Sequence, residues 1–392
     1  MNVTTLILGA GAAGLMCAAH AGPGTLVIDH AKAPGEKIRI SGGGRCNFTN
    51  LYTAPGNFLS QNPHFCKSAL KRYTQWDFIA LVDRHGIAWH EKTLGQLFCD
   101  GKSTQVVEML TAEMRAAGAD LWLQTSVVGV SHDGSRFSVI LDREGRRTVV
   151  TASNLVLATG GKSIPKMGAT GLSYDIARQF GLAVTETRPA LVPLTFSDQR
   201  FAPLSGVSLP ATARTNGTSF DEALLFTHRG LSGPAILQVS SFWREGDEIA
   251  LRLAPPTLYD DLRAARQEAG RVNLTTALAR HLPARLVEHL AGPLQLTGNL
   301  ADQSDARLRA LCETLSDWRH KPTGSEGYRT AEVTLGGIDT DGLNSRDMQA
   351  RDVPGLYAIG EAVDVTGWLG GYNFQWAWAS GHAAGTALAA RG

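Results

Sequence analysis

Glycines at regular spacing near the start of the chain indicate a phosphate-binding turn. Residues 9–14 read GAGAAG, a G-x-G-x-x-G pattern, directly after the apolar run Thr4–Leu8 and before a small-residue segment typical of a helix. In such a turn the first glycine permits the sharp bend, the second lets a pyrophosphate approach the backbone, and the third lets the helix pack on the strand. Asp29 follows a second apolar run, Thr25–Ile28, where a carboxylate can accept ribose hydroxyls. The pattern predicts a dinucleotide site.

A second glycine-rich stretch, residues 41–47, reads SGGGRCN. Glycines without Cβ atoms let a bulky ligand lie against the backbone. The Arg45 guanidinium can donate to phosphate or flavin carbonyl oxygens, and the Asn47 amide can hydrogen-bond to ring heteroatoms. Because a nicotinamide site usually needs no second loop of this kind, flavin is the favoured dinucleotide. The alternative is an ordinary surface loop, since glycine-rich turns are common.

Longer motifs carry a resemblance to a known family. GAGAAG and the following PGEKIRISGGGRCNFTN (34–50) resemble the BaiN-like (YhiN-type) family of NAD(P)/FAD-dependent oxidoreductases. Further matches follow in family order: LVLATGGKSIPKMGATG (155–171), LFTHRGLSGPA (225–235), AEVTLGGI (331–338) and GLYAIGEAVDVTGWLGGYNFQWAWASGHAAG (355–385). The resemblance covers nearly the whole chain and implies FAD as the cofactor. Many flavin domains end their last strand in Gly-Asp, whereas this chain has Gly360-Glu361, as its family does.

The resemblance implies an α/β fold: a glutathione-reductase-like Rossmann FAD domain, discontinuous, with an inserted antiparallel β-barrel-like domain that carries a helical subdomain. The residues point the same way, because 189–255 alternate like antiparallel strands and 257–318 space their apolar residues three and four apart, as helices do. We expect the FAD domain at 1–188 and 333–392, the β-barrel-like insert at 189–256 and about 320–332, and the helical subdomain at 257–319.

The fingerprint, the glycine run and the resemblance together predict the cofactor site. Apolar runs Leu155–Ala158 and Leu356–Ile359 should be strands that end beside it, and a helix from Asn373 to Ala390 should direct its N-terminus at the flavin. The predicted FAD-binding residues are Gly9, Gly11, Ala12, Ala13, Gly14, Asp29, His30, Lys37, Ser41, Gly42, Gly43, Gly44, Arg45, Cys46, Asn47, Val128, Ala158, Thr159, Gly160, Gly161, Gly360, Glu361, Gly370, Gly371, Tyr372, Asn373 and Phe374.

Four side chains are candidates for catalysis, each with a plainer alternative. His228 lies in a predicted turn and could face a substrate pocket, or it could be a turn residue with a satisfied ring. Tyr372 and Asn373 could serve proton transfer, or they could only orient the flavin. Cys46 stands beside Arg45, which could lower the pKa of its thiol, or it could be a small buried residue that packs under the loop.

Composition limits the class of protein. Hydrophobic residues make up 43%, so the chain is globular, and 37 Lys+Arg against 36 Asp+Glu give a net charge of +1, which does not favour a nucleic-acid or membrane-surface protein. Two short basic clusters, residues 143–147 and 319–321, could touch RNA phosphate, or they could be ordinary solvated surface. Five cysteines without a C-x-x-C pattern favour free thiols in a reducing cytoplasm over a zinc site or a redox dithiol. No apolar run is long enough to span a bilayer.

Three functions stay open at this stage. The first is an enzyme in which NAD(P)H reduces FAD and hydride passes to an activated C=C bond, in a steroid-type enone or in a uracil ring of ribosomal RNA. The second is an FAD-dependent oxidase of a small amine that uses oxygen. The third is a non-catalytic, FAD-stabilised module that associates with RNA or ribosomes. A single dinucleotide fingerprint, with no second one for NAD(P)H, is compatible with all three.

Overall fold

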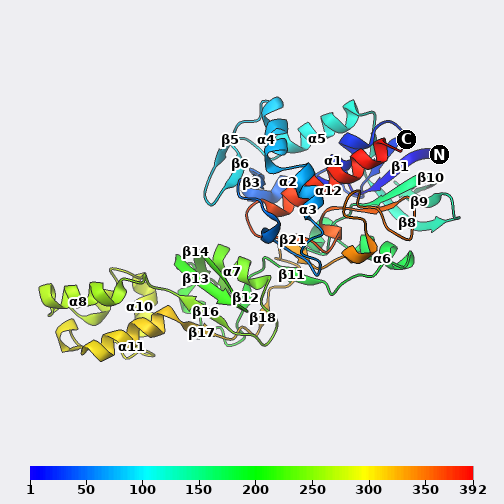
Figure 1. Ribbon diagram of the computed structural model, residues 1–392. Helices are drawn as coiled ribbons and strands as arrows, with labels where there is room; N and C mark the ends of the chain where they lie inside the picture. The colour runs from blue at the N-terminus through cyan, green and yellow to red at the C-terminus, as the bar shows by residue number, and fades with distance from the viewer. Residues whose placement is uncertain (392) are drawn as a thin grey trace. The chain divides into compact units, whose positions relative to one another are not determined.

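The computed structural model describes residues 1–391 and divides the chain into two compact units. Unit 1 comprises Met1–Arg188 and Val333–Gly392, and unit 2 comprises Pro189–Glu332 (Figure 1). Unit 1 is therefore built from the two ends of the chain. None of the helices in the described residues is long and apolar enough to cross a bilayer.

A mostly parallel sheet forms the centre of unit 1, in the order β7-β2-β1-β10-β9-β8, with β20 also paired to β10. Its parallel strands carry almost continuous apolar runs, as expected for strands covered on both faces. Their registers align Leu8 with Ile28 and with Leu157, and Leu157 with Ala358, so the carboxyl ends of β1, β2, β10 and β20 meet at one edge. The bounds are β1 (Asn2–Leu8), β2 (Thr25–Ile28), β7 (Asp120–Trp122), β8 (Thr125–His132), β9 (Phe137–Arg143), β10 (Arg146–Leu157) and β20 (Leu356–Ala358).

Helix α1 (Ala12–Ala21) packs on this sheet, and α12 (Tyr372–Ala389), from the other end of the chain, packs closely on α1 (Figure 1). Glycines permit the close approach, since a Cβ added at Gly381 would lie 2.6 Å from the Ala13 carbonyl oxygen. The other helices of unit 1 are α2 (Glu36–Ile40), α3 (Lys67–Arg72), α4 (Gln75–Arg84), α5 (Thr104–Ala116) and α6 (Leu172–Gln179).

Residues between α2 and α5 add small sheets that the sequence analysis did not predict. β3 (Asn47–Asn50), β6 (Gln96–Cys99) and β5 (Trp89–Glu91) form an antiparallel sheet, and β4 (Phe58–Leu59) pairs with β21 (Thr366–Gly367). The Trp378 indole of α12 donates to the Phe48 carbonyl at 2.8 Å. These contacts bring the glycine-rich stretch next to the start of α12.

Unit 2 contains an antiparallel sheet in the order β17-β16-β13-β14-β15-β12-β18. Among the described residues β17 and β18 do not pair with each other, so closure into a barrel stays a prediction. Helix α8 spans the segment LYDDLRAARQEA, whereas the next expected helical segment divides before Pro283, because proline lacks an N–H and cannot continue a helix. The strands are β12 (Leu194–Thr195), β13 (Ser208–Thr215), β14 (Thr218–Phe226), β15 (Gly230–Ser232), β16 (Ile249–Arg252), β17 (Trp318–His320) and β18 (Gly324–Ser325); the helices are α7 (Pro234–Ser240), α8 (Leu258–Ala269), α9 (Leu274–Leu278), α10 (Ala284–Ala291) and α11 (Asp305–Ser316).

Candidate functional site

The three glycines of the first turn have different surroundings. A Cβ added at Gly9, whose φ is +112°, would lie 2.4 Å from the Ala158 carbonyl oxygen, and one at Gly14 would lie 1.9 Å from the Gly9 carbonyl oxygen. Gly9 and Gly14 therefore serve packing between β1, α1 and β10. A Cβ at Gly11 would meet nothing within 4 Å. The free space at Gly11, at the N-terminus of α1, fits a dinucleotide pyrophosphate.

Asp29 fastens the same turn to the end of β2. Its Oδ2 accepts the Ala10 N–H at 2.7 Å and its Oδ1 accepts the Ala31 N–H at 2.9 Å. The His30 ring lies beside it, with Nδ1 3.3 Å from Oδ1. Because a carboxylate has about four lone-pair sites, Asp29 still has capacity to accept ribose hydroxyls.

The glycine-rich stretch forms a short 3₁₀ turn, Ser41–Gly44, in left-handed conformation. Gly42, Gly43 and Gly44 have φ values of +57°, +67° and +88°, which strongly favour glycine. A Cβ at Gly42 would lie 2.7 Å from the Phe98 ring, whereas one at Gly43 or Gly44 would meet nothing within 4 Å. One glycine thus serves packing, and the other two face open space where a ligand can approach.

Cys46 closes this turn and is fully buried. Burial raises the pKa of its thiol far above the ordinary value, although a hydrogen bond with Ser41 opposes the shift. A neutral, inaccessible thiol is a poor nucleophile. The structure therefore favours the packing role of Cys46 over the catalytic one.

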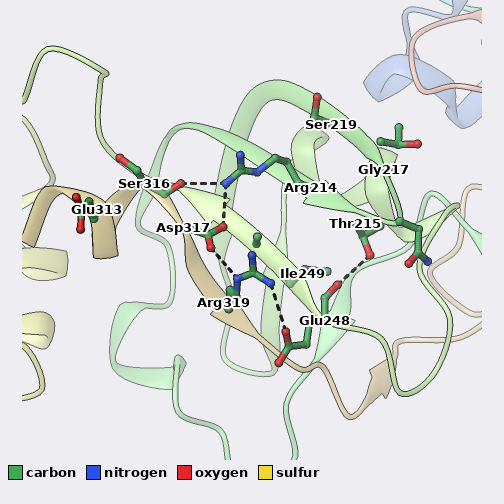
Figure 2. A pocket seen from close by; sticks show the side chains of 13 residues that line it. Arg214, Thr215, Gly217, Ser219, Glu248, Ile249, Glu313, Ser316, Asp317 and Arg319 are labelled. Carbon is green, nitrogen blue, oxygen red and sulfur yellow. Dashed lines mark hydrogen bonds and ion pairs between the residues drawn. The ribbon is translucent and has the colours of Figure 1, made fainter. Parts of the chain in front are cut away.

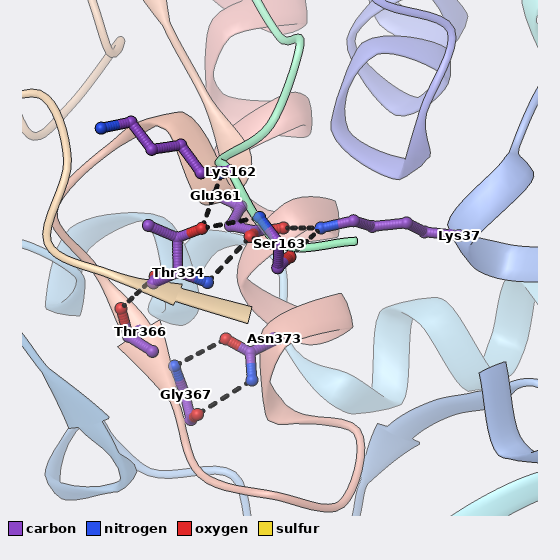
Figure 3. A network of polar contacts seen from close by, with 8 residues as sticks. All are labelled: Lys37, Lys162, Ser163, Thr334, Glu361, Thr366, Gly367 and Asn373. Carbon is purple, nitrogen blue, oxygen red and sulfur yellow. Dashed lines mark hydrogen bonds and ion pairs between the residues drawn. The ribbon is translucent and has the colours of Figure 1, made fainter. Parts of the chain in front are cut away.

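A polar network joins the end of β20 to α2 and to the segment after β10 (Figure 3). Glu361 Oε2 accepts from Lys37 Nζ at 2.7 Å, and Glu361 Oε1 accepts from the Ser163 hydroxyl at 3.0 Å. The Thr334 N–H also donates to Oε1 at 3.0 Å, while Lys37 Nζ donates to Ser163 Oγ at 2.6 Å. Lys37 and Glu361 thus neutralise each other, and the network holds four distant segments together.

Ser163 and Thr334 lie within the family motifs 155–171 and 331–338, but sequence reasoning assigned neither a role, because their partners are distant in the sequence. The Thr334 hydroxyl accepts the backbone N–H groups of Lys162 and Ser163 at 2.7 and 3.1 Å. A Cβ at Gly161 would lie 2.4 Å from that hydroxyl and 2.8 Å from Glu361 Oε1. The glycine of the Thr-Gly-Gly motif leaves room for this network, which is a signal that only the structure reveals.

The N-terminus of α12 can stabilise a negatively charged group. Its first turn contains no acidic residue and no side chain caps its N–H groups. Gly371, with φ of +96°, lies against β3, since a Cβ there would come within 2.4 Å of the Thr49 carbonyl oxygen. Asn50 Nδ2 donates to the Gly370 carbonyl at 2.9 Å. A helix N-terminus without a side-chain cap suits the negative charge that a reduced flavin carries near its pyrimidine carbonyl.

Asn373 and Tyr372 differ in what they can do there. The Asn373 amide forms two hydrogen bonds of 2.8 Å with Gly367, accepting its N–H and donating to its carbonyl (Figure 3). This pairing fixes the loop before α12 and favours a positioning role for Asn373. The Tyr372 ring is buried and packs edge-to-face with Phe58 and Trp368 at 6.2 and 6.3 Å between ring centroids.

Comparison with known proteins decides the family. The family model described as "HI0933-like protein Rossmann domain" matches residues 3–387. The chain belongs to this family. The resemblance to BaiN-like (YhiN-type) proteins is thereby confirmed, and this HI0933-like protein is an FAD-dependent oxidoreductase.

Two relatives and one solved structure are similar to this HI0933-like protein over nearly its full length. It is 54% identical over 388 residues to the ribosomal RNA dihydrouridine synthase of Escherichia coli K12, covering 96% of this chain and 95% of the relative. It is 27% identical over 414 residues to the 3-dehydro-bile acid delta(4,6)-reductase of Clostridium scindens, covering 98% of each. Its fold is similar to that of a 3-ketosteroid-delta4-(5alpha)-dehydrogenase from Rhodococcus jostii RHA1, with a TM-score of 0.54, 15% identity, and coverage of 99% of this chain and 97% of that one.

Two other predicted site residues of the HI0933-like protein lie away from these contacts. Val128, in β8, is 48% exposed and stands at a register shift between Val127 and Gly129, so it has no cross-strand partner in the β8–β9 pairing. Its contact with FAD stays a prediction. His228 belongs to unit 2, where it is exposed in the turn between β14 and β15, and its catalytic role also stays a prediction.

A hollow of about 820 Å³ in unit 2 is lined in part by Arg319, the first residue of one of the basic clusters (Figure 2). Arg319 donates to Asp317 at 2.7 Å and lies 3.8 Å from Glu248, and Arg214 donates to Asp317 at 2.9 Å. His320 is half-buried, and burial lowers its pKa to about 4, so its ring is neutral. Nearby carboxylates thus neutralise Arg319 and the His320 ring is uncharged, which weakens the case for the RNA contact considered for residues 319–321.

The other basic cluster, residues 143–147, forms the tip of the β9–β10 hairpin. The Arg143 guanidinium lies over the Trp122 ring, 5.3 Å from its centroid. Acidic Asp142 and Glu144 interrupt the run of arginines. The cluster is thus mixed in charge, which weakens the case for phosphate binding at this tip.

Proposed function

We propose that this FAD-dependent oxidoreductase reduces a carbon–carbon double bond conjugated to a carbonyl group, and that its substrate is a uracil ring in ribosomal RNA. The observation that carries the proposal is the 54% identity, across almost the full length of both chains, to a protein named as a ribosomal RNA dihydrouridine synthase. Dihydrouridine is uridine with a saturated C5–C6 bond. A cytoplasmic location, where ribosomal RNA is found, is part of the proposal.

The reaction adds two electrons and two hydrogens to uracil. A hydride adds to C6, which is activated by the C4 carbonyl, and a proton adds to C5. Bound FAD supplies the hydride chemistry, and NAD(P)H is the proposed donor of the electrons that reduce it.

Residues of unit 1 have assigned tasks in this proposal. The backbone at Gly11 and the start of α1 hold the pyrophosphate, and Asp29 accepts the ribose hydroxyls. The N-terminus of α12, which no side chain caps, stabilises negative charge on the reduced cofactor. The Lys37–Glu361 pair keeps the surrounding loops in position. Tyr372 is the proposed proton donor to C5.

The reaction is tested by mixing the anaerobically reduced enzyme with a transcript of ribosomal RNA. We expect reoxidation of the flavin and a mass gain of two hydrogens on one uridine. Reoxidation by steroid-type enones alone would favour the second candidate, a reductase of small enones, which the 27% identity to a bile acid reductase supports. Peroxide formation with small amines and no need for NAD(P)H would overturn both in favour of an oxidase.

Tyr372→Phe tests the proton donor separately from cofactor binding. The change removes only a hydroxyl, so we expect normal FAD content and RNA affinity. Loss of a general acid should slow reoxidation by RNA about 10²–10⁴-fold. A rate within a factor of a few of the unmodified enzyme would show that Tyr372 only orients the flavin.

A further inference from the structure

Residues 37–76 contain no Asp or Glu, although the whole chain has 36 acids and 37 Lys+Arg. The basic residues of this stretch are Lys37, Arg39, Arg45, Lys67, Lys71 and Arg72. Such a segment produces a local positive potential that the net charge of the protein does not show. Sequence analysis overlooked it, because it searched for runs of basic residues and not for an absence of acids.

The structure separates the bound cations of this stretch from the free ones. Lys37 is paired with Glu361, and Arg39 Nε donates to the Pro34 carbonyl at 3.0 Å. Lys67, Lys71 and Arg72 are exposed, and none of the three has a carboxylate within ion-pair distance in residues 1–391. All three lie on α3. The Arg72 guanidinium also donates to the Ser68 and Arg346 carbonyl oxygens, which leaves Lys67 and Lys71 as the two of these three cations whose side chains have no hydrogen-bond partner among the described residues.

Exposed aromatic rings accompany these cations. Tyr52 is 65% exposed and Trp76 is 59% exposed. The Gln75 side chain donates to the Leu51 carbonyl at 2.9 Å, which joins the segments that carry the two rings. A Cβ added at Gly95 would lie 2.7 Å from Tyr52 Cδ2, so the Tyr52 ring rests on this glycine while much of its surface stays open.

The same segment borders the loop that leads into α12. β4 pairs with β21, which places Leu59 opposite Thr366 and Phe58 opposite Gly367. Asn50 Nδ2 donates to the Gly370 carbonyl at 2.9 Å, one residue before Gly371 and the start of the helix. An RNA strand bound at Tyr52 would therefore lie close to the loop where the reacting end of FAD is expected.

We propose that Tyr52, Lys67, Lys71, Arg72 and Trp76 bind single-stranded RNA. We name them the acid-free face after the stretch 37–76 that contains them, although the exposed Asp77 follows Trp76 directly. Bases stack on the Tyr52 and Trp76 rings, and the three cations contact phosphates, as in proteins that bind single strands through aromatic platforms and positive charge. The face holds the nucleotides that flank the target uridine. The inference rests on the proposed function for its RNA substrate, but it concerns binding and can be tested without turnover.

The test is the affinity of the FAD-loaded full chain for a fluorescein-labelled oligouridylate of about 12 nucleotides. We expect Tyr52→Ala to weaken binding about 5- to 150-fold, the range for loss of one stacked base. Tyr52→Phe keeps the ring and should bind within a factor of about two. The double variant Lys67→Ala/Lys71→Ala should reduce the slope of log affinity against log salt by about 1.4, at about 0.7 for each phosphate contact.

The matched control is Arg146→Ala/Arg147→Ala, two equally exposed cations on the β9–β10 hairpin. This control should leave both the affinity and the salt slope unchanged. An equal loss in the control and in the lysine variant would overturn the inference, because binding would then follow overall charge. So would unchanged affinity in both Tyr52→Ala and the lysine variant, or a wild-type protein that prefers anionic lipid vesicles to RNA. FAD absorbance of each variant reports that it has folded.

Experiments can refute the RNA-binding inference and the proposed catalytic function separately. If the wild-type protein binds the oligonucleotide through the acid-free face but forms no dihydrouridine in ribosomal RNA, the proposed function is wrong and the inference stands. If it forms dihydrouridine and the variants bind and react normally, the inference is wrong and the proposed function stands.

Discussion

Gly11 and Gly14 are three residues apart, yet their surroundings assign them opposite tasks. An added Cβ at Gly14 would collide with the Gly9 carbonyl oxygen at 1.9 Å, whereas one at Gly11 would enter open space. Gly11 also has an ordinary φ of −81°, so alanine is compatible with its backbone. Gly14 is thus required for packing within the protein, whereas Gly11 leaves space for the ligand.

Gly11→Ala and Gly14→Ala separate these tasks. We expect Gly11→Ala to leave the urea midpoint of the FAD-free protein unchanged and to weaken FAD binding at least tenfold, measured by quenching of flavin fluorescence. Gly14→Ala should destabilise the FAD-free protein by about 1–3 kcal/mol or more, as for other overpacked sites. Equal loss of stability in both variants would contradict the assignment of Gly11 to the cofactor.

Sequence reasoning reached some residues of the site and missed others for a physical reason. Local patterns predicted the glycine turn and Asp29, because strand, turn, helix and acid follow one another within 30 residues. The Glu361 network joins residues 37, 163, 334 and 361, and no local rule specifies which distant donors meet one carboxylate. Burial of Cys46 was likewise settled only by the packing of the loop around it.

At the scale of elements, α12 couples the cofactor region to a cluster of rings near its far end. The His382 ring lies 4.6 Å from those of His20 and Tyr73, centroid to centroid, and its Nδ1 is buried without a hydrogen-bond partner among the described residues. Burial first, and then the positive charges of His20 and Arg72, lower its pKa from 6.5 to about 4, although Asp77 opposes the shift. The folded protein thus keeps this ring neutral.

Stability should fall as pH drops from about 6.5 to about 4, because the unfolded chain binds a proton at His382 in this window and the folded chain does not. Above about 6.5 neither state binds it, so the contribution to the free energy of unfolding is fully present. His382→Phe should flatten that part of the pH profile, measured by urea unfolding, and should not lower stability at pH 7. His320 has the same kind of shift, so some slope should remain.

Replacing the exposed His64 by glutamine provides the control, since it removes a histidine with no such ring cluster. An unchanged pH profile in His382→Phe would show that His382 takes up its proton in the folded state.

Helices and strands whose apolar residues are regularly spaced along the sequence were predictable. The segment LYDDLRAARQEA is α8 without change, and Thr25–Ile28 is β2. The small sheets between α2 and α5 were not predicted, because strands of two to four residues carry too short a pattern and depend on distant partners such as β21.

At the scale of the whole molecule, unit 1 contains a contiguous hydrophobic core formed by residues of both its chain segments. The residues of unit 1 that flank the inserted unit 2 in the sequence lie side by side, since the Thr185 N–H donates to the Gly337 carbonyl at 2.8 Å. The discontinuity could be anticipated from the change of period along the sequence, whereas strand order in unit 2 depends on non-local pairing.

Replacing residues 189–332 by a short Gly/Ser linker should yield a folded flavoprotein, because the core and the predicted FAD contacts of unit 1 lie outside the deleted segment. We expect FAD affinity within about tenfold of the full chain, measured by flavin absorbance after gel filtration. Unit 2 expressed alone is the control and should bind no flavin. An aggregated or flavin-free unit 1 would show that unit 2 is required to complete the FAD domain.

The position of α12 at the end of unit 1 also orders events during protein synthesis. A ribosome makes α1 and β10 first, then all of unit 2, and only then β20 and α12, which complete the sheet and cover α1. At about 5–20 residues per second, synthesis of unit 2 delays that completion by roughly 7–30 s. During this interval the nascent first segment exposes apolar surface that α12 will later cover. Cofactor insertion must therefore await the synthesis of α12, and chaperones that shield nascent chains should bind this protein until that helix has emerged.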